Sequence, residues 1–260
     1  MKKIFLLMMI FMVFFTGCDF GKSNQPQLDT LGKIRQRGKL IVGVKYDSKP
    51  FGFLDRNNQV QGFDIDVARE IAKNILGDPN AVEFKQVTTS NRIFMLTSDA
   101  VDMVIATMTI NPKRLEVVDF SQPYYVAGQA IMIPQNSSIK GVKDLNNKKV
   151  IIVLGSTSEK NIRMLAPEAV IQGFRTYNDA FSALKAGRGE ALTTDDSILY
   201  GFLDSDSNYK ILPERYTKEP YGIAIKKGSE TETLRILIDE SLYHMQKNGT
   251  LKQIKHKWVK

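Results

Sequence analysis

The sequence predicts an α/β protein of two lobes, and three observations point to this class. Its 260 residues exceed the size of most single domains, so two folding units are expected. A hydrophobic content of 43% with 25% charged residues provides enough apolar side chains for buried cores and argues against disorder. Short apolar runs alternate with amphipathic segments, which is the pattern of βαβ units in mainly parallel sheets.

The elements expected in the first half follow this alternation. An apolar run at 39–44 has the length of a strand, and Pro50 and Gly52 soon interrupt the chain. Asp64 is placed to cap a helix that ends at Gly77. The apolar residues of that helix recur at helical spacing: Ile65, Ala68, Ile71, Ala72 and Ile75. The remaining elements expected here are a strand at 82–87, a short helix at 91–97 and a buried strand at 101–106.

The second half continues the alternation and then becomes helical. The expected strands and helices are strands at 150–154, 169–173 and 191–194, and helices at 159–166 and 178–186. A strand at 221–225 precedes a long helix that Ser229 caps and Gly249 ends, and a final short helix reaches Trp258. Turn-rich segments at 122–125 and 218–222 are candidates for crossings between the lobes.

The N-terminus has the pattern of an export signal. Lys2 and Lys3 precede the apolar run 4–15, which is too short to cross a membrane as a helix of about 20 residues. The run ends in Phe15-Thr16-Gly17-Cys18, which resembles a lipobox although Phe replaces the usual Leu. We therefore expect residues 1–17 to be a signal peptide, Cys18 to carry lipid and 18–27 to be a tether. The alternative is a buried core helix with an unrelated cysteine.

This N-terminus limits what the net charge of +8 can mean. Basicity alone suggests a nucleic-acid partner, but an extracytoplasmic protein held to the cell membrane by lipid makes that partner unexpected. A single cysteine excludes an internal disulfide or a CxxC-type zinc site. The two histidines, His244 and His256, lie in the C-terminal helical region, so neither a metal site nor a Ser-His-Asp arrangement is expected. No cofactor is predicted.

Seven motifs in order resemble one known family. They are GKLIVGV (38–44), GFDIDVAREIA (62–72), VDMVIATMTINPKR (101–114), DFSQPYY (119–125), VKDLNNKKVIIVLGSTSE (142–159), TTDDSILYGF (193–202) and PYGIAIKKGS (220–229). The chain resembles the bacterial extracellular solute-binding proteins of family 3, the polar-amino-acid receptors of ABC importers. The resemblance implies a two-lobed, type II periplasmic-binding-protein-like fold with two mixed, mainly parallel sheets and a ligand cleft between the lobes. Lobe 1 would comprise 28–123 and 222–260, and lobe 2 would comprise 124–221 with both hinge segments.

The same resemblance implies a set of residues for the α-carboxylate and α-ammonium of a free amino acid. Arg114 would bind the carboxylate through its forked guanidinium, and Thr109 would add its hydroxyl and backbone N–H. Ser156 and Thr157, in the turn across the cleft, would contribute N–H groups to the carboxylate site. The ammonium would meet the carbonyl of Thr107 and the carboxylate of Asp195, and this completes the set. The alternatives are a solvated surface arginine and an Asp195 that only caps a helix.

Side-chain selectivity depends on fewer residues. Lys45 stands where glutamine-binding relatives carry an acidic residue, and Arg92 stands where many relatives place an apolar one. Lys45, Arg92 and Arg114 against Asp195 leave the site with excess positive charge, which a second ligand carboxylate would balance. The sequence therefore favours aspartate or glutamate and the branch of the family that binds them. If Lys45 instead pairs with Asp47 or points to solvent, glutamine or another polar amino acid becomes the ligand.

Two other functions, a dehydratase and a surface adhesin, are not expected. A few relatives on this fold are dehydratases, but neither Glu159 nor Glu190 can be tied to the cleft as the general acid that such an enzyme requires. A surface adhesin with an idle cleft is the other alternative, and the complete set of ammonium and carboxylate ligands argues against it. The expected partners are therefore an amino acid and a membrane-embedded ABC permease, with the receptor itself a monomer and not an enzyme.

Overall fold

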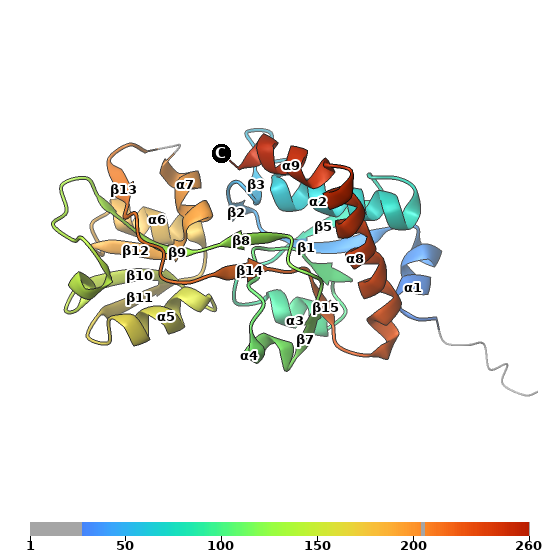
Figure 1. Cartoon of the computed structure of the whole chain (residues 1–260), viewed down its shortest axis with the longest axis horizontal. Coiled ribbons are helices and arrows are strands. Elements are labelled where there is room, and N and C mark those ends of the chain that lie inside the picture. The colour runs from blue at the N-terminus through green and yellow to red at the C-terminus, as the bar shows by residue number, and fades with distance from the viewer. Residues whose placement is uncertain (1–27, 204–205, 260) are drawn as a thin grey trace, which may run out of the picture.

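The computed structural model describes residues 28–203 and 206–259, and the predicted signal peptide and Cys18 lie outside them. Two five-stranded sheets form two lobes, each covered by helices (Figure 1). Each sheet is mixed: parallel pairs at its centre and one side are joined by antiparallel strands. The predicted α/β class with two mixed sheets is thereby confirmed.

Lobe 1 is built from both ends of the described chain. Its sheet has the order β5-β1-β6-β15-β7, formed by β1 (Leu40–Val44), β5 (Val82–Gln86), β6 (Met103–Val104), β7 (Val118–Phe120) and β15 (Ala224–Lys226). Its helices are α1 (Thr30–Arg37), α2 (Phe63–Leu76), α3 (Arg92–Thr97), α4 (Pro112–Leu115), the 3₁₀ turn η2 (Ser229–Thr231), α8 (Glu232–Lys247) and α9 (Thr250–Trp258). A small antiparallel sheet lies beside it, formed by β2 (Asp47–Ser48), β3 (Gly52–Leu54) and β4 (Val60–Gln61).

Lobe 2 is formed by one continuous part of the chain. Its sheet has the order β11-β10-β12-β9-β13, formed by β9 (Gln129–Pro134), β10 (Lys149–Val153), β11 (Val170–Phe174), β12 (Ala191–Asp195) and β13 (Tyr209–Ile211). Its helices are the 3₁₀ turn η1 (Val142–Leu145), α5 (Thr157–Leu165), α6 (Tyr177–Lys185) and α7 (Asp196–Leu203). Two antiparallel strands, β8 (Tyr125–Ala127) and β14 (Glu219–Tyr221), run side by side between the lobes (Figure 1).

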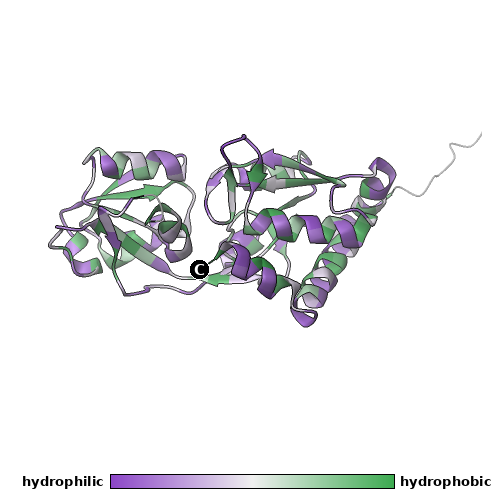
Figure 2. Cartoon of the chain, turned by 90° about the horizontal axis from the view of Figure 1, so that it is seen from above, coloured by the Kyte–Doolittle hydropathy of each residue, from purple (hydrophilic) through white to green (hydrophobic). Residues whose placement is uncertain are grey.

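The hydropathy pattern explains why these segments form layers. The strands of both sheets are mostly hydrophobic, and the helices turn hydrophilic residues outward (Figure 2). Strand β1 buries four of its five residues, and α2 buries Ile65, Val67, Ala68 and Ile71 against the sheet. Each such aliphatic side chain contributes about 1.5–3 kcal/mol when it is fully buried. The sheets therefore form the centres of the two cores.

Several expected elements have different bounds in the structure. The strand expected at 101–106 pairs only at β6, because the chain leaves the sheet and reaches a left-handed conformation at Thr107. The strand expected at 221–225 is divided into β14 and β15. Ser229 begins the 3₁₀ turn η2, so α8 starts two residues later than the capping pattern suggested. These differences all lie where the backbone bends toward the space between the lobes or toward α8.

Candidate ligand-binding site between the lobes

The facing edges of the two lobes are in direct contact. The Arg114 guanidinium of lobe 1 donates through Nη2 to the carbonyl of Gly155 in lobe 2 at 3.3 Å. The backbone N–H of Tyr177, the first residue of α6, donates to the Asp47 carboxylate of lobe 1 at 2.8 Å. A Cβ added at Gly155 would lie 3.0 Å from the Cα of Ser90, so the backbones are also close. The candidate site therefore lies where the two lobes meet.

Thr107 forms the first part of the site. It follows β6 with a φ of 47°, a conformation that is unfavourable for a β-branched residue and is often found at functional sites. Its N–H donates to the Asp64 carboxylate at 3.3 Å, which holds this turn in place. The Thr107 hydroxyl oxygen is buried and has no hydrogen-bond partner among the described residues.

Asp64 differs from its expected role as a helix cap. The N-cap of α2 is Gly62, whose φ of 138° favours glycine. Asp64 is fully buried, and its other carboxylate oxygen accepts the Tyr124 hydroxyl at 3.0 Å. Burial raises the pKa of Asp64 to about 7, against the opposing effects of the Tyr124 and Thr107 hydrogen bonds and the Arg92 charge. Asp64 therefore links the start of a hinge strand to the Thr107 turn.

Two buried arginines lie on the lobe 1 side. Arg114 is anchored in α4 by the Asn111 side chain, which accepts its N–H at 2.9 Å, and its Nη1 donates to the Thr109 carbonyl at 2.7 Å. Arg92 donates through Nη1 to the carbonyls of Ala106 and Thr107 at 2.6 and 3.3 Å. Burial lowers the pKa of both side chains, that of Arg92 to about 9. Neither arginine is the solvated surface charge of the alternative interpretation.

Asp195 occupies the end of β12, facing these cations. Its Oδ2 accepts the hydroxyl of the hinge residue Tyr221, while its Oδ1 is buried without a partner in the described parts of the chain. Burial raises the pKa of Asp195 to about 7, and the Tyr221 hydrogen bond opposes this shift. The first turn of α7 is instead served by Asp196, whose carboxylate accepts the Ser197 N–H at 2.7 Å. Asp195 is therefore available for a ligand and is not occupied as a helix cap.

Ser156 and Thr157 lie at the start of α5, across from the arginines. The Ser156 N–H donates to the Val153 carbonyl at 3.2 Å, so this N–H is already used, contrary to expectation. Its hydroxyl is buried and unpaired within the described structure. The Thr157 hydroxyl donates to Glu219 of the hinge strand β14 at 2.9 Å. The structure thus brings both residues to the site, although each has fewer free groups than the sequence suggested.

Lys45 is fully buried at the opposite end of the site. Its Nζ lies 3.3 Å from Asp47 Oδ1, donates to the Thr89 hydroxyl at 3.1 Å, and is 4.9 Å from the centroid of the Tyr177 ring. Burial lowers the pKa of Lys45 to about 8, although the charge of Asp47 opposes the shift. The ion pair with Asp47 is the arrangement that the alternative interpretation anticipated, and it alters the charge count on which the acidic preference depended.

Six of the eight sequence-predicted binding residues are buried, Ser156 and Thr157 are half-buried, and the chemistry of the set favours a small polar ligand. Buried polar atoms in proteins almost always have partners. Within the described residues, four buried side-chain atoms of the site have none: Arg92 Nε, Thr107 Oγ1, Ser156 Oγ and Asp195 Oδ1. A ligand with an anionic and a cationic group would pair with the arginines and with Asp195, respectively. No group of three potential metal-ligating residues is found among 28–203 and 206–259.

Sequence reasoning missed three residues of this region. Tyr177 lines the Lys45 end from lobe 2, Glu219 lies beside Arg114 from the hinge, and Asp64 supports the Thr107 turn. The available signals were weak: an aromatic residue at a helix start, an acid within a short strand, and an acid in the first turn of a helix. Such residues become informative only when their neighbours across the cleft are known.

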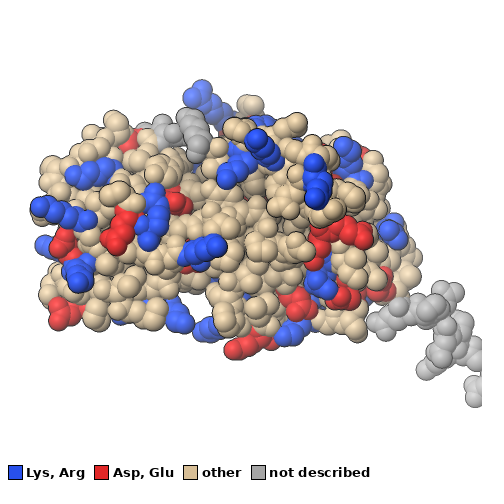
Figure 3. Space-filling model, viewed as in Figure 1, with Lys and Arg blue, Asp and Glu red and all other residues tan. Residues whose placement is uncertain are grey.

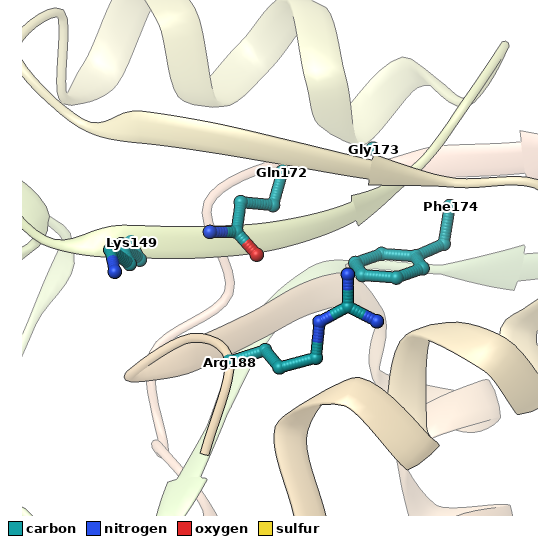
Figure 4. A pocket seen from close by; sticks show the side chains of 5 residues that line it. All are labelled: Lys149, Gln172, Gly173, Phe174 and Arg188. Carbon is teal, nitrogen blue, oxygen red and sulfur yellow. The ribbon is translucent and has the colours of Figure 1, made fainter. Parts of the chain in front are cut away.

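A second hollow, on lobe 2, lacks these features. Lys149, Gln172, Gly173, Phe174 and Arg188 line it, and the Arg188 guanidinium lies against the Phe174 ring, 5.3 Å from its centroid (Figure 4). None of these lining residues carries a buried unpartnered side-chain atom. On the face shown in Figure 3, basic and acidic side chains are interspersed over both lobes. The buried unpartnered groups where the lobes meet remain the stronger candidate.

Comparison with known proteins identifies the family. The family model of the bacterial extracellular solute-binding proteins, family 3, matches residues 40–260. The chain belongs to this family. A similar relative is the ABC transporter glutamine-binding protein GlnH of Bacillus subtilis, 43% identical over 100% of this chain and 98% of the relative. The glutamine-binding protein of Geobacillus stearothermophilus is 49% identical over 83% of this chain and 82% of its own.

A solved structure supports the fold of this solute-binding protein. An ancestral arginine-binding protein bound to glutamine has a TM-score of 0.80 and 42% identity, covering 85% of this chain and 98% of the other. The acids considered for a dehydratase have other partners than the site residues Arg92 and Arg114: Glu159 pairs with Arg163 on α5, and Glu190 accepts the Lys149 N–H. In the described ranges, no helix is long and apolar enough to cross a membrane.

Proposed function

We propose that this solute-binding protein is the extracytoplasmic receptor of an amino-acid ABC importer, that glutamine is its ligand, and that it delivers the ligand to a membrane permease. Two relatives named above are glutamine-binding proteins, and the similar ancestral protein was solved with glutamine. The chain itself contributes the more specific support, through the buried polar groups where the lobes meet.

The α-carboxylate and the α-ammonium of the ligand would each pair with an oppositely charged side chain of the site. Its α-carboxylate would pair with Arg114, which already holds both lobes through the Thr109 and Gly155 carbonyls. The Ser156 hydroxyl would supply a further donor to that carboxylate. The α-ammonium would donate to Asp195 Oδ1, with the Thr107 hydroxyl beside it as a further acceptor. Apart from Arg114, these pairings use atoms that lack partners within the described structure.

The Lys45–Asp47 ion pair is the main reason for proposing glutamine instead of an acidic amino acid. Each cation of the site has a carboxylate neighbour inside the protein: Asp47 for Lys45, Asp64 for Arg92, and Glu219 with Asp195 for Arg114. A second ligand carboxylate within about 4 Å of Asp47 would be repelled by about 4 kcal/mol at an effective dielectric constant of about 20, which offsets its attraction to Lys45. The desolvation of that carboxylate would then remain uncompensated. A neutral amide avoids this cost.

Calorimetric titration of the purified protein with each of the twenty amino acids tests the proposal. Glutamine should bind most tightly, and at 100 times its dissociation constant it should stabilise the fold by about 2.7 kcal/mol. If glutamate or aspartate bound tenfold more tightly than glutamine, the acidic preference favoured by the sequence would replace this assignment. If no amino acid bound, the receptor function itself would be wrong.

The remaining parts of this proposal concern closure and anchoring. Strands β8 and β14 would act as hinges, with the lobe boundaries between residues 123 and 124 and between 221 and 222. Cys18 would carry the lipid anchor, and its prediction rests on the sequence alone because the residue lies outside the described ranges. Labelling with a radioactive fatty acid should modify the wild type and spare Cys18→Ser. The receptor would act as a monomer and would not catalyse a reaction.

A further inference from the structure

The Asp47 carboxylate interacts with both lobes, with Lys45 in lobe 1 and with Tyr177 in lobe 2. One of its carboxylate oxygens, Oδ1, lies 3.3 Å from Lys45 Nζ and accepts the Ser48 hydroxyl at 3.2 Å. The other, Oδ2, accepts the backbone N–H of Tyr177 from lobe 2 at 2.8 Å. The Lys45 side chain is fully buried and that of Asp47 is 11% exposed, so solvent screens this arrangement little.

The start of α6 in lobe 2 offers backbone N–H groups that a carboxylate can accept. Tyr177 is the first residue of α6, a nine-residue helix whose N-terminal N–H groups have no partners inside the helix. The N-cap residue Thr176 satisfies the N–H of Asp179 through its hydroxyl at 3.0 Å. Asp47 satisfies a different N–H of the same turn, and it does so from the opposite lobe. This bond can form only when the lobes are together.

We infer that Asp47 is both a specificity-determining residue and a positioning residue for lobe closure. Its charge neutralises Lys45 and so prevents that cation from attracting an acidic ligand side chain. Its second oxygen holds α6 against lobe 1, which places the Tyr177 ring over the Lys45 ammonium at 4.9 Å. Ligand choice and closure thus depend on one carboxylate. The inference rests on the proposed function, because it concerns the same site.

Two substitutions with opposite expected effects test the role in specificity. Asp47→Asn leaves an oxygen for the Tyr177 N–H but removes the counter-charge of Lys45, so the affinity for glutamate relative to glutamine should rise about tenfold or more. Lys45→Met removes the cation and should lower the same ratio by a similar factor. The double variant, which removes both charges, should return the ratio to within about threefold of the wild type. Asp99→Asn, which breaks an exposed pair with Lys226 inside lobe 1, is the matched control and should not change the ratio.

Hydrogen exchange tests the role in closure separately. In glutamine-saturated protein, the amide of Tyr177 should exchange about tenfold faster in Asp47→Ala than in the wild type, because its acceptor is lost. The amide of Asp179, which is held by Thr176, serves as the internal reference on the same helix.

The possible outcomes separate the two proposals. If the wild type binds no amino acid, the proposed function fails. If the wild type binds glutamine but the glutamate-to-glutamine ratio is the same in Asp47→Asn, Lys45→Met and wild type, the specificity role of Asp47 is refuted. If exchange at Tyr177 is unchanged in Asp47→Ala, its role in closure is refuted. Should Asp47→Asn fail to fold, Asp47→Ala, which also removes the counter-charge of Lys45, decides the specificity role in its place.

Discussion

Asp195 should make ligand binding depend on pH within the range from 5 to 7. The α-ammonium of an amino acid pairs with the ionised carboxylate, and burial raises the pKa of Asp195 to about 7 in the protein. Below that pH the carboxyl group becomes protonated and neutral, so binding must first release a proton. Because the pKa is raised, affinity is retained at and above pH 7 and is lost as the pH falls.

The expected magnitude follows from the ionised fraction. With a pKa of about 7, about half of the Asp195 carboxyl groups are ionised at pH 7, about a tenth at pH 6 and about a hundredth at pH 5. If only the ionised form binds the ligand, the dissociation constant should rise about fivefold between pH 7 and 6. It should rise about tenfold more between pH 6 and 5. Lys45, whose pKa is lowered to about 8, stays largely protonated over this interval.

Isothermal titration with glutamine at these three pH values provides the assay. Repeating each titration in two buffers with different heats of ionisation counts the released protons, and close to one proton should be released at pH 6. Asp195→Asn should bind weakly and without this pH dependence. Asp99→Asn serves as the control, because Asp99 is an exposed carboxylate that pairs with Lys226 inside lobe 1. A wild-type dissociation constant that is constant within twofold from pH 5 to 7 would refute the assignment of Asp195.

Three further predictions concern closure, the carboxylate site and stability. A Cβ at Gly201 would overlap the backbone oxygen of Lys49 across the cleft, so Gly201→Ala should weaken glutamine binding at least tenfold in calorimetry. Gly141→Ala should not, because the nearest atom to its Cβ would be Glu214 Oε2 at 3.9 Å, an ordinary contact. Arg114→Met should weaken binding by two to three orders of magnitude, since breaking a buried charge pair costs about 3–5 kcal/mol; an effect below tenfold contradicts its role. The pKa of Asp64 rises from 3.8 to about 7 on folding, so the folded state binds this proton more tightly and stability falls as pH rises between these values. In denaturant titrations over this pH range, the free energy of unfolding of Asp64→Asn should fall by about 4 kcal/mol less than that of the wild type. An equal fall in the two proteins would contradict the prediction.

Much of the fold could be predicted because hydrophobic periodicity is a local property. The runs that become β1, β10 and β12 and the apolar spacing of α2 are visible in the chain without any partner. The ends of elements were less predictable where distant contacts decide them. The strand expected to reach residue 106 ends early at β6 because the Thr107 turn is held by Asp64, which lies 43 positions away in sequence.

The sequence by itself determined the class of protein and the family resemblance and predicted a set of candidate binding residues, since these depend on residue type and order along the chain. Only the tertiary structure decided what each charge faces. Lys45 and Asp47 are two positions apart, and the sequence left open whether they pair, whereas the structure places them 3.3 Å apart and brings the start of α6 to the same carboxylate. Because the energy of a charge depends on its burial and its nearest counter-charge, composition could not choose the ligand. The proposed choice of glutamine therefore rests on a buried ion pair within lobe 1, which composition could not reveal.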